Sequence, residues 1–79
     1  NYIRDVASGA LTITSSNDKD QFEFILELRL GASWSGGAMT VCGRSLDMTN
    51  AAANKVKILR MRYDSSKTAW YFISNMDWV

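Results

Sequence analysis

The stretch Phe22-Glu23-Phe24-Ile25-Leu26-Glu27-Leu28-Arg29-Leu30 decides the fold class of this chain. Apolar residues occupy every second position from Phe22 to Leu30, and charged residues fill three of the four positions between them. This period of two is typical of a strand with one buried face, whereas a helix would spread the same apolar residues around its circumference. Ile25 falls on the otherwise charged face, which indicates either a covered outer patch or a contact with another subunit.

Four other segments show strand patterns and are spaced by about ten residues, with polar or small turn residues between them. In one of them the apolar positions move from even to odd residue numbers between Ile58 and Leu59. Such a slip reverses the faces of a strand, so we expect a β-bulge or a twist at that point. The segment 69–73 is apolar on both sides, which predicts a strand covered on both faces. The four segments are 11–14, 39–44, 55–63 and 69–73.

Turn-forming residues separate these segments along the whole chain. Residues 15–20 form a polar loop, 31–37 a loop of small residues that carries Trp34, and 64–67 a short hairpin connection. The stretch 47–54 is the only helix-compatible part, and it is so short that we expect a loop or a single turn. The chain is therefore expected to be all-β: a small antiparallel β-sandwich, jelly-roll-like, of about five or more strands, with residues 1–79 as a single domain.

The composition excludes several classes of function. The chain has 79 residues, a formal net charge of +1, no histidine, no proline and one cysteine, Cys42. Without histidine there is no His-dependent triad, base or metal site, and one cysteine allows neither an internal disulfide nor a cysteine-based zinc site. The near-neutral charge gives no strong attraction to nucleic acids or anionic membranes. We therefore expect no enzyme activity, no cofactor and no metal in this chain.

The sequence also lacks membrane and export signals. No segment approaches the roughly 20 apolar residues of a membrane-spanning helix, and the first residues lack the pattern of a signal peptide. The chain begins with Asn1 rather than methionine, so we expect it to start within a longer chain. We expect no insertion into a membrane.

Chain length makes self-association the expected source of stability. A domain below about 80 residues rarely builds a sufficient core without disulfides, metals or oligomerisation, and the first two are excluded here. Trp78 lies one residue from the C-terminus and would fray unless it docks, which fits a contact between subunits. The residues expected at the subunit interface are Ile25, Leu26, Leu28, Met61 and Trp78.

Few polar side chains form a recognisable chemical pattern. Asp18 and Asp20 in the polar loop suggest a calcium site or a solvated turn, but the glycine and glutamate of a full calcium loop are missing. Glu23 and Glu27 share a strand face and are too generic to indicate an acid–base pair. Cys42 has no histidine to activate it, so we expect a small buried hydrophobic residue there.

Aromatic residues are the most suggestive class for binding. Trp34 stands in a loop of small residues, where it forms either a surface contact or a plug that caps the end of the sandwich. If exposed, its ring can stack on a sugar, and Trp34 with Arg44 are the candidate glycan-binding residues. Trp70 and Phe72 alternate within a strand and are expected in the core.

A basic strand face offers an alternative partner. Arg29, Arg44, Arg60 and Arg62 project from strands and, together with aromatic residues, are compatible with single-stranded nucleic acid binding by a small barrel. Glu23 and Glu27 lie on the same face as Arg29, which favours a solvated face of alternating charge.

The last third of the chain carries a resemblance to a known class of domains. An apolar strand 55–62 runs into Tyr63-Asp64, a polar turn, and then Trp70-Tyr71 in a final strand. This pattern resembles the closing hairpin of small β-domains at the C-termini of bacteriophage tail fibres and tailspikes. About twenty-five residues carry the likeness, and no glycan-binding residue can be transferred from it by position.

The resemblance implies a homotrimeric module at the distal end of a phage fibre. It would act in trimerisation, folding or the binding of bacterial surface polysaccharide, outside the cell and as part of the virion. Two alternatives stay open: a monomeric carbohydrate-binding or adhesin module, and a small nucleic-acid-binding β-barrel.

Overall fold

Seven strands and their connections make up the chain, and the computed structural model describes all residues 1–79. No helical segment of the length and hydrophobicity needed to cross a bilayer is present. The strands are β1 (Tyr2–Val6), β2 (Leu11–Ile13), β3 (Glu23–Leu30), β4 (Met39–Val41), β5 (Arg44–Ser45), β6 (Val56–Asp64) and β7 (Ala69–Asn75).

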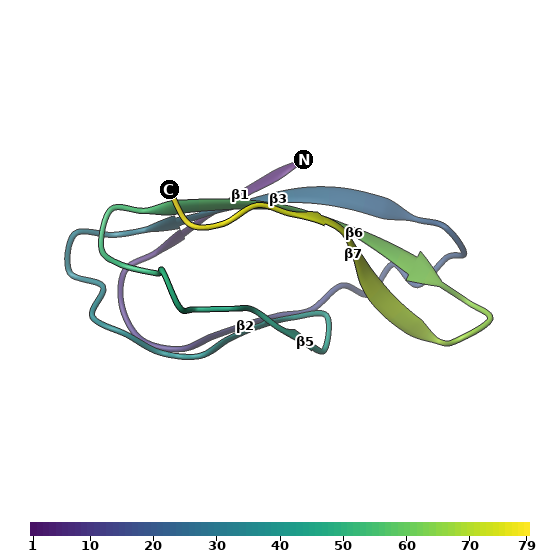
Figure 1. Cartoon of the computed structure of the whole chain (residues 1–79). Helices are drawn as coiled ribbons and strands as arrows, with labels where there is room; N and C mark the ends of the chain where they lie inside the picture. The colour runs from purple at the N-terminus through teal and green to yellow at the C-terminus, as the bar shows by residue number, and fades with distance from the viewer.

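The strands form two layers that face one another (Figure 1). The upper layer is a four-stranded sheet of order β1-β3-β6-β7, and the lower layer is a three-stranded sheet of order β2-β4-β5. The expected all-β fold is therefore confirmed, and the two layers have the arrangement of a small sandwich.

Each sheet contains one parallel pair, whereas the sequence pattern had predicted antiparallel pairing. β1 is parallel to β3, and β2 is parallel to β4. The chain passes from the upper sheet to the lower after β1, returns for β3 and descends again for β4 (Figure 1). Because each crossing reverses the chain, two crossings restore its direction, and strands that become neighbours after two crossings run parallel.

The core lies between the two layers and follows the alternation of the two longest strands. In β3 the residues Phe24, Leu26, Leu28 and Leu30 are buried, and Ile25 between them is exposed. The lower sheet contributes Met39 and Val41 from β4. The full core cluster is Val6, Phe24, Leu26, Leu28, Leu30, Trp34, Met39, Val41, Leu46, Leu59, Met61, Tyr63, Trp70 and Trp78.

Most of this core is covered within a single chain. The accessible surface is 4841 Å², close to the about 4,800 Å² expected for a monomeric protein of this mass. The expectation of an interior that only neighbouring copies can complete is therefore not met. Any need for a partner must come from the surface.

The reversal of strand faces that the sequence predicted between Ile58 and Leu59 does not occur. β6 alternates without interruption, with Lys57 buried, Ile58 exposed and Leu59 buried. A lysine can occupy the inward position because its long side chain reaches the edge of the core, where Nζ donates a hydrogen bond to the Met76 carbonyl oxygen at 2.8 Å. The irregularity lies instead between Arg60 and Met61, in the pairing with β7.

Two other predicted strands differ from the structure. The segment 39–44 is not one strand, because Cys42 and Gly43 have φ angles of 50° and 80° and form the two-residue turn between β4 and β5. The last strand is not covered on both faces: β7 is an edge strand, so Ile73 is exposed and Tyr71 is half-buried. The loop at 47–54 and the hairpin after Asp64 are confirmed.

Candidate functional site

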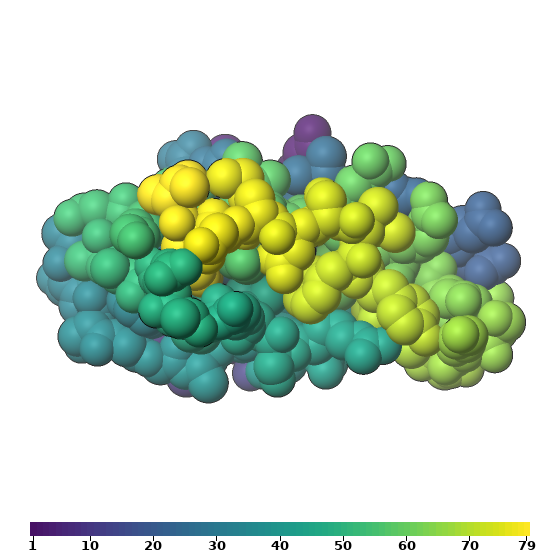
Figure 2. All heavy atoms as spheres, in the orientation of Figure 1, coloured from purple at the N-terminus to yellow at the C-terminus, as the bar shows by residue number.

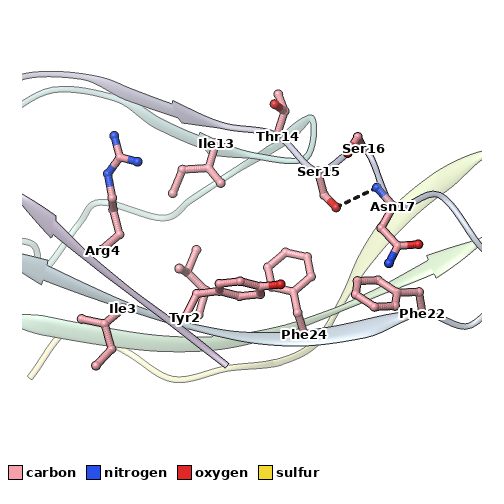
Figure 3. Close-up of a pocket in the computed structure, with 11 residues that line it drawn as sticks. Tyr2, Ile3, Arg4, Ile13, Thr14, Ser15, Ser16, Asn17, Phe22 and Phe24 are labelled. Atoms are coloured by element: carbon pink, nitrogen blue, oxygen red, sulfur yellow. Dashed lines mark hydrogen bonds between the residues drawn. The ribbon is translucent and has the colours of Figure 1, made fainter.

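A cleft of about 430 Å³ separates the two sheets along one side of the sandwich (Figure 3). Strand β1 and the start of β3 form its floor, and the segment from Ile13 to Asn17 forms its roof. The chain folds this way because β1 and β2 are the edge strands of their sheets, and β2 has only three residues. The lower sheet is therefore too narrow to cover β1.

The opposite side of the sandwich is closed. The Arg44 Nε on β5 donates a hydrogen bond to the Trp70 carbonyl oxygen on β7 at 2.6 Å. The Trp78 Nε1 donates to the Asp47 carbonyl oxygen at 3.0 Å. Figure 2 shows the C-terminal residues, in yellow, running along this side against the teal atoms of the lower layer. The two sheets are therefore in contact on this side and separated on the side of the cleft.

Three aromatic rings line the floor of the cleft. The ring centroids of Tyr2 and Phe24 are 5.9 Å apart with their planes at 79°, and those of Phe22 and Phe24 are 6.5 Å apart. The buried Trp70 packs behind them, with its centroid 5.4 Å from that of Phe24. The edge-to-face contacts of Phe24 with Tyr2 and Trp70 hold the rings in place, so the floor is a supported apolar platform.

The roof of the cleft is polar beyond Ile13. The backbone N–H of Asn17 donates a hydrogen bond to the Ser15 Oγ at 3.2 Å, as the dashed line in Figure 3 shows. The Asn17 Oδ1 is buried and has no hydrogen-bond partner. Buried acceptors without a partner are rare and cost stability, so the Asn17 side chain is an unusual feature of this roof.

Arg4 lies at the other end of the cleft and is the only charged residue that lines it (Figure 3). It comes from β1 and makes no ion pair and no hydrogen bond within the chain, and no aspartate or glutamate lines the cleft. Asp5, the next residue, projects from the opposite face because successive strand residues alternate. The cleft therefore presents an uncompensated positive charge beside an aromatic floor.

The outer face of the four-stranded sheet is a second unusual surface. Ile25 and Ile58 are 37% and 38% exposed, although both lie within central strands of the sheet. Met76 and Val79 extend this apolar line along β6, since the Met76 N–H bonds to the Ile58 carbonyl oxygen and Val79 pairs with Val56 in both directions. We call Ile25, Ile58, Met76 and Val79 the outer apolar strip.

The charged residues around this strip are mostly engaged in ion pairs with one another. The Glu23 carboxylate accepts hydrogen bonds from Arg60 Nε at 2.7 Å and from Arg62 Nε at 2.8 Å. The bond from Arg62 is the main cause that holds the pKa of Glu23 below its usual value. Glu27 pairs with Arg29 on the same face. Two copies of this face can therefore approach without a large excess of like charge.

The two residues predicted to bind a glycan do not form an open site. Trp34 is buried, and its Nε1 donates a hydrogen bond to the Gly9 carbonyl oxygen at 3.3 Å. This burial contradicts the interpretation of Trp34 as a surface contact and agrees with its interpretation as a plug. The Arg44 guanidinium lies 4.7 Å from the centre of the Tyr71 ring and is bonded to Trp70, so both predicted residues are engaged within the chain.

The five predicted interface residues separate into two groups. Leu26, Leu28, Met61 and Trp78 are all buried by this chain's own residues, and only Ile25 reaches the surface. An interface between copies would have to be built on Ile25 and the outer apolar strip. Trp70 lies in the core as predicted, and Phe72 packs partly buried against it.

The remaining polar candidates have structural surroundings. The Asp20 Oδ1 accepts a hydrogen bond from the backbone N–H of Ser65 at 3.1 Å, so the 15–20 loop braces the turn between β6 and β7. No group of three or more His, Cys, Asp or Glu residues is placed to hold a metal ion. Cys42 is half-buried against the core, and this burial raises the pKa of its thiol.

The sequence did not identify Tyr2 and Arg4 as site residues because it did not reveal β1. The inner face of this strand carries Tyr2, Arg4 and Val6, and its outer face carries Ile3 and Asp5. Each face mixes an apolar residue with a charge, so no alternation separates them. Ser15 and Asn17 were recognised only as members of a polar loop.

Comparison with known proteins gives no family for the chain: no family model, no curated protein and no solved structure matches it.

Proposed function

We propose that the chain is a non-enzymatic module that associates with identical copies, as the C-terminal trimerisation and folding domain of a phage tail fibre or tailspike. The outer apolar strip carries the self-association part of this proposal. The phage assignment rests on the resemblance of the segment 55–74 to the closing hairpins of such domains, and it places the module in the virion, outside the cell.

The strip supports association because its side chains lie on one face of the four-stranded sheet, where most charged residues are already paired. Burial of a whole isoleucine side chain is worth about 1.5–3 kcal/mol. Ile25 and Ile58 are already more than half covered, so one pair of isoleucines adds only part of that value. Stable association therefore requires the strip of every copy, which favours a closed, symmetric assembly over a single contact.

The mass of the particle in solution tests this function. Size-exclusion chromatography with light scattering should give three times the 8.9 kDa mass of one chain at micromolar concentration. The double variant Ile25→Lys, Ile58→Lys should elute as a folded monomer, because it places charges on the strip without entering the core. Thr12→Lys, at an exposed position of β2 in the other sheet, is the control and should keep the mass of the wild type. A monomeric wild type would overturn the proposal.

Carbohydrate binding is a second candidate function, and the cleft favours it. A supported aromatic floor beside hydroxyl and amide groups suits the two faces of a sugar ring. This candidate no longer rests on Trp34. The nucleic-acid alternative gains nothing from the structure, since Arg29, Arg60 and Arg62 are all paired with carboxylates.

A further inference from the structure

We infer that the cleft between β1 and the segment 13–17 binds an acidic saccharide, with Arg4 as the residue that selects for its carboxylate. This inference rests on the carbohydrate-binding candidate above and is independent of self-association. Three properties of the cleft lead to it: its size, the division of its lining into an apolar floor and a polar roof, and its isolated charge.

The size of the cleft admits a small ligand. Its volume of about 430 Å³ lies within the range of about 300–1,000 Å³ that is usual for small-molecule sites. One or two sugar rings fit such a space.

The lining calls for a ligand with one apolar and one polar face. The rings of Tyr2 and Phe24 offer a surface for the C–H face of a pyranose. Opposite them, the Ser15 hydroxyl and the Asn17 amide supply polar groups for the hydroxyls of a sugar. An added β-strand from another chain fits less well, because its inward apolar side chains would meet this polar roof.

The charge of the cleft then defines the class of sugar. Arg4 has no partner in the chain, and no carboxylate among the lining residues repels an anion. A guanidinium group binds a carboxylate through two parallel hydrogen bonds, so a uronic or sialic acid residue satisfies Arg4 where a neutral sugar leaves it unpaired.

Nuclear magnetic resonance titration of the whole chain tests the inference. The probes are trigalacturonate and oligosialic acid, with galactotriose as the neutral comparison. We expect at least one acidic probe to shift the amide signals of Arg4, Ser15, Asn17 and Phe24, with an affinity at least tenfold above that of galactotriose. Binding of neither acidic probe, equal binding of acidic and neutral probes, or shifts confined to the outer face of the sheet would overturn it. The inference would also be overturned if a peptide, or a second copy of the chain, produced these shifts in the absence of sugar.

Two variants separate charge selection from a loss of folding. Arg4→Gln should weaken acidic binding by about tenfold or more, the value of one charge-assisted hydrogen bond, and leave galactotriose binding unchanged. Arg29→Gln, on the outer face of β3, is the matched control and should bind like the wild type. Light scattering on the same samples distinguishes the two proposals: Arg4→Gln should keep the mass of the wild type, and an intact trimer that binds no acidic probe would refute only the cleft.

Discussion

The ammonium group of Lys57 lies 5.5 Å from the centre of the Trp78 indole ring and anchors the C-terminal segment to β6. Lys57 is 2% exposed and is the only charged residue in the interior. Its Nζ also donates a hydrogen bond to the Met76 carbonyl oxygen at 2.8 Å. The loss of solvation on burial lowers the pKa of Lys57, although Asp77 and Asp47 act in the opposite direction.

This burial predicts a pH dependence of stability. Between the lowered pKa of folded Lys57 and the usual 10.5, the unfolded chain binds more protons at this group than the folded one does. The contribution of Lys57 to the free energy of unfolding therefore rises with pH across that window. Urea unfolding followed by tryptophan fluorescence from pH 7 to pH 10.5 should show the wild type gaining stability relative to Lys57→Met.

A comparison of variants isolates this effect from the titration of other groups. Lys67→Met removes an exposed lysine of the β6–β7 turn, and its stability relative to the wild type should show no such rise. A constant difference between wild type and Lys57→Met over the whole pH range would contradict the role of burial.

Trp78 should be one of the most destabilising positions to truncate. It is 3% exposed, contacts Lys57 and donates a hydrogen bond to Asp47. Truncation of a buried tryptophan to alanine costs about 3–5 kcal/mol, a large part of the about 5–15 kcal/mol that stabilises a typical domain. Trp78→Ala should lower the urea midpoint strongly, while Thr12→Ala, at an exposed position of β2 outside the outer apolar strip, should change stability by less than about 0.5 kcal/mol. Similar midpoints for the two variants would show that the segment does not dock.

The sequence was sufficient to predict the all-β class and the buried face of the longest strand, but not the order or direction of the strands in the sheets. In β3, strict alternation separates Leu26 and Leu28 from Glu27, and the burial of these residues follows it. The parallel pairing of β1 with β3 depends on where the chain crosses between sheets. No local pattern encodes that crossing, because a loop that crosses to the other sheet contains the same turn residues as a loop that stays in its own sheet.

The site was harder to predict than the fold because it exists only where the lower sheet leaves part of the upper sheet uncovered. Arg4 and Asn17 become neighbours of one cleft only because β2 is too short to cover β1. Lysine is rarely buried, so the sequence gives no sign that Lys57 lies inside, where Met76 and Trp78 contact its ammonium group. Both outcomes depend on contacts between segments far apart in the sequence.

Gly37 should tolerate no side chain, because another loop lies against it. Gly36 and Gly37 have φ angles of 135° and 136°, so alanine strains the backbone equally at both positions. A Cβ atom at Gly37 would overlap the backbone of Gly9 and lie 2.5 Å from the Ala10 nitrogen, whereas a Cβ at Gly36 meets no atom within 4 Å. Gly37→Ala should therefore be less stable than Gly36→Ala by about 1–3 kcal/mol, the usual cost of overpacking. Equal thermal midpoints for the two variants would mean that the loops are not in contact.

Glu23 predicts the acid limb of the stability profile. The hydrogen bonds from Arg62 and Arg60 hold the pKa of folded Glu23 below its model-compound value of 4.5. The folded state therefore binds fewer protons here than the unfolded state, so the stabilisation is complete above pH 4.5 and is lost as the pH falls through the folded pKa. Glu23→Gln removes this titration, and its unfolding midpoint should fall less steeply than that of the wild type as the pH is lowered below 4.5. Asp18→Asn, at a side chain that makes no hydrogen bond or ion pair, serves as the control and should follow the wild-type curve. Since these ion pairs are exposed, added salt should also reduce the difference between wild type and Glu23→Gln, and a difference that is insensitive to salt would contradict their electrostatic origin.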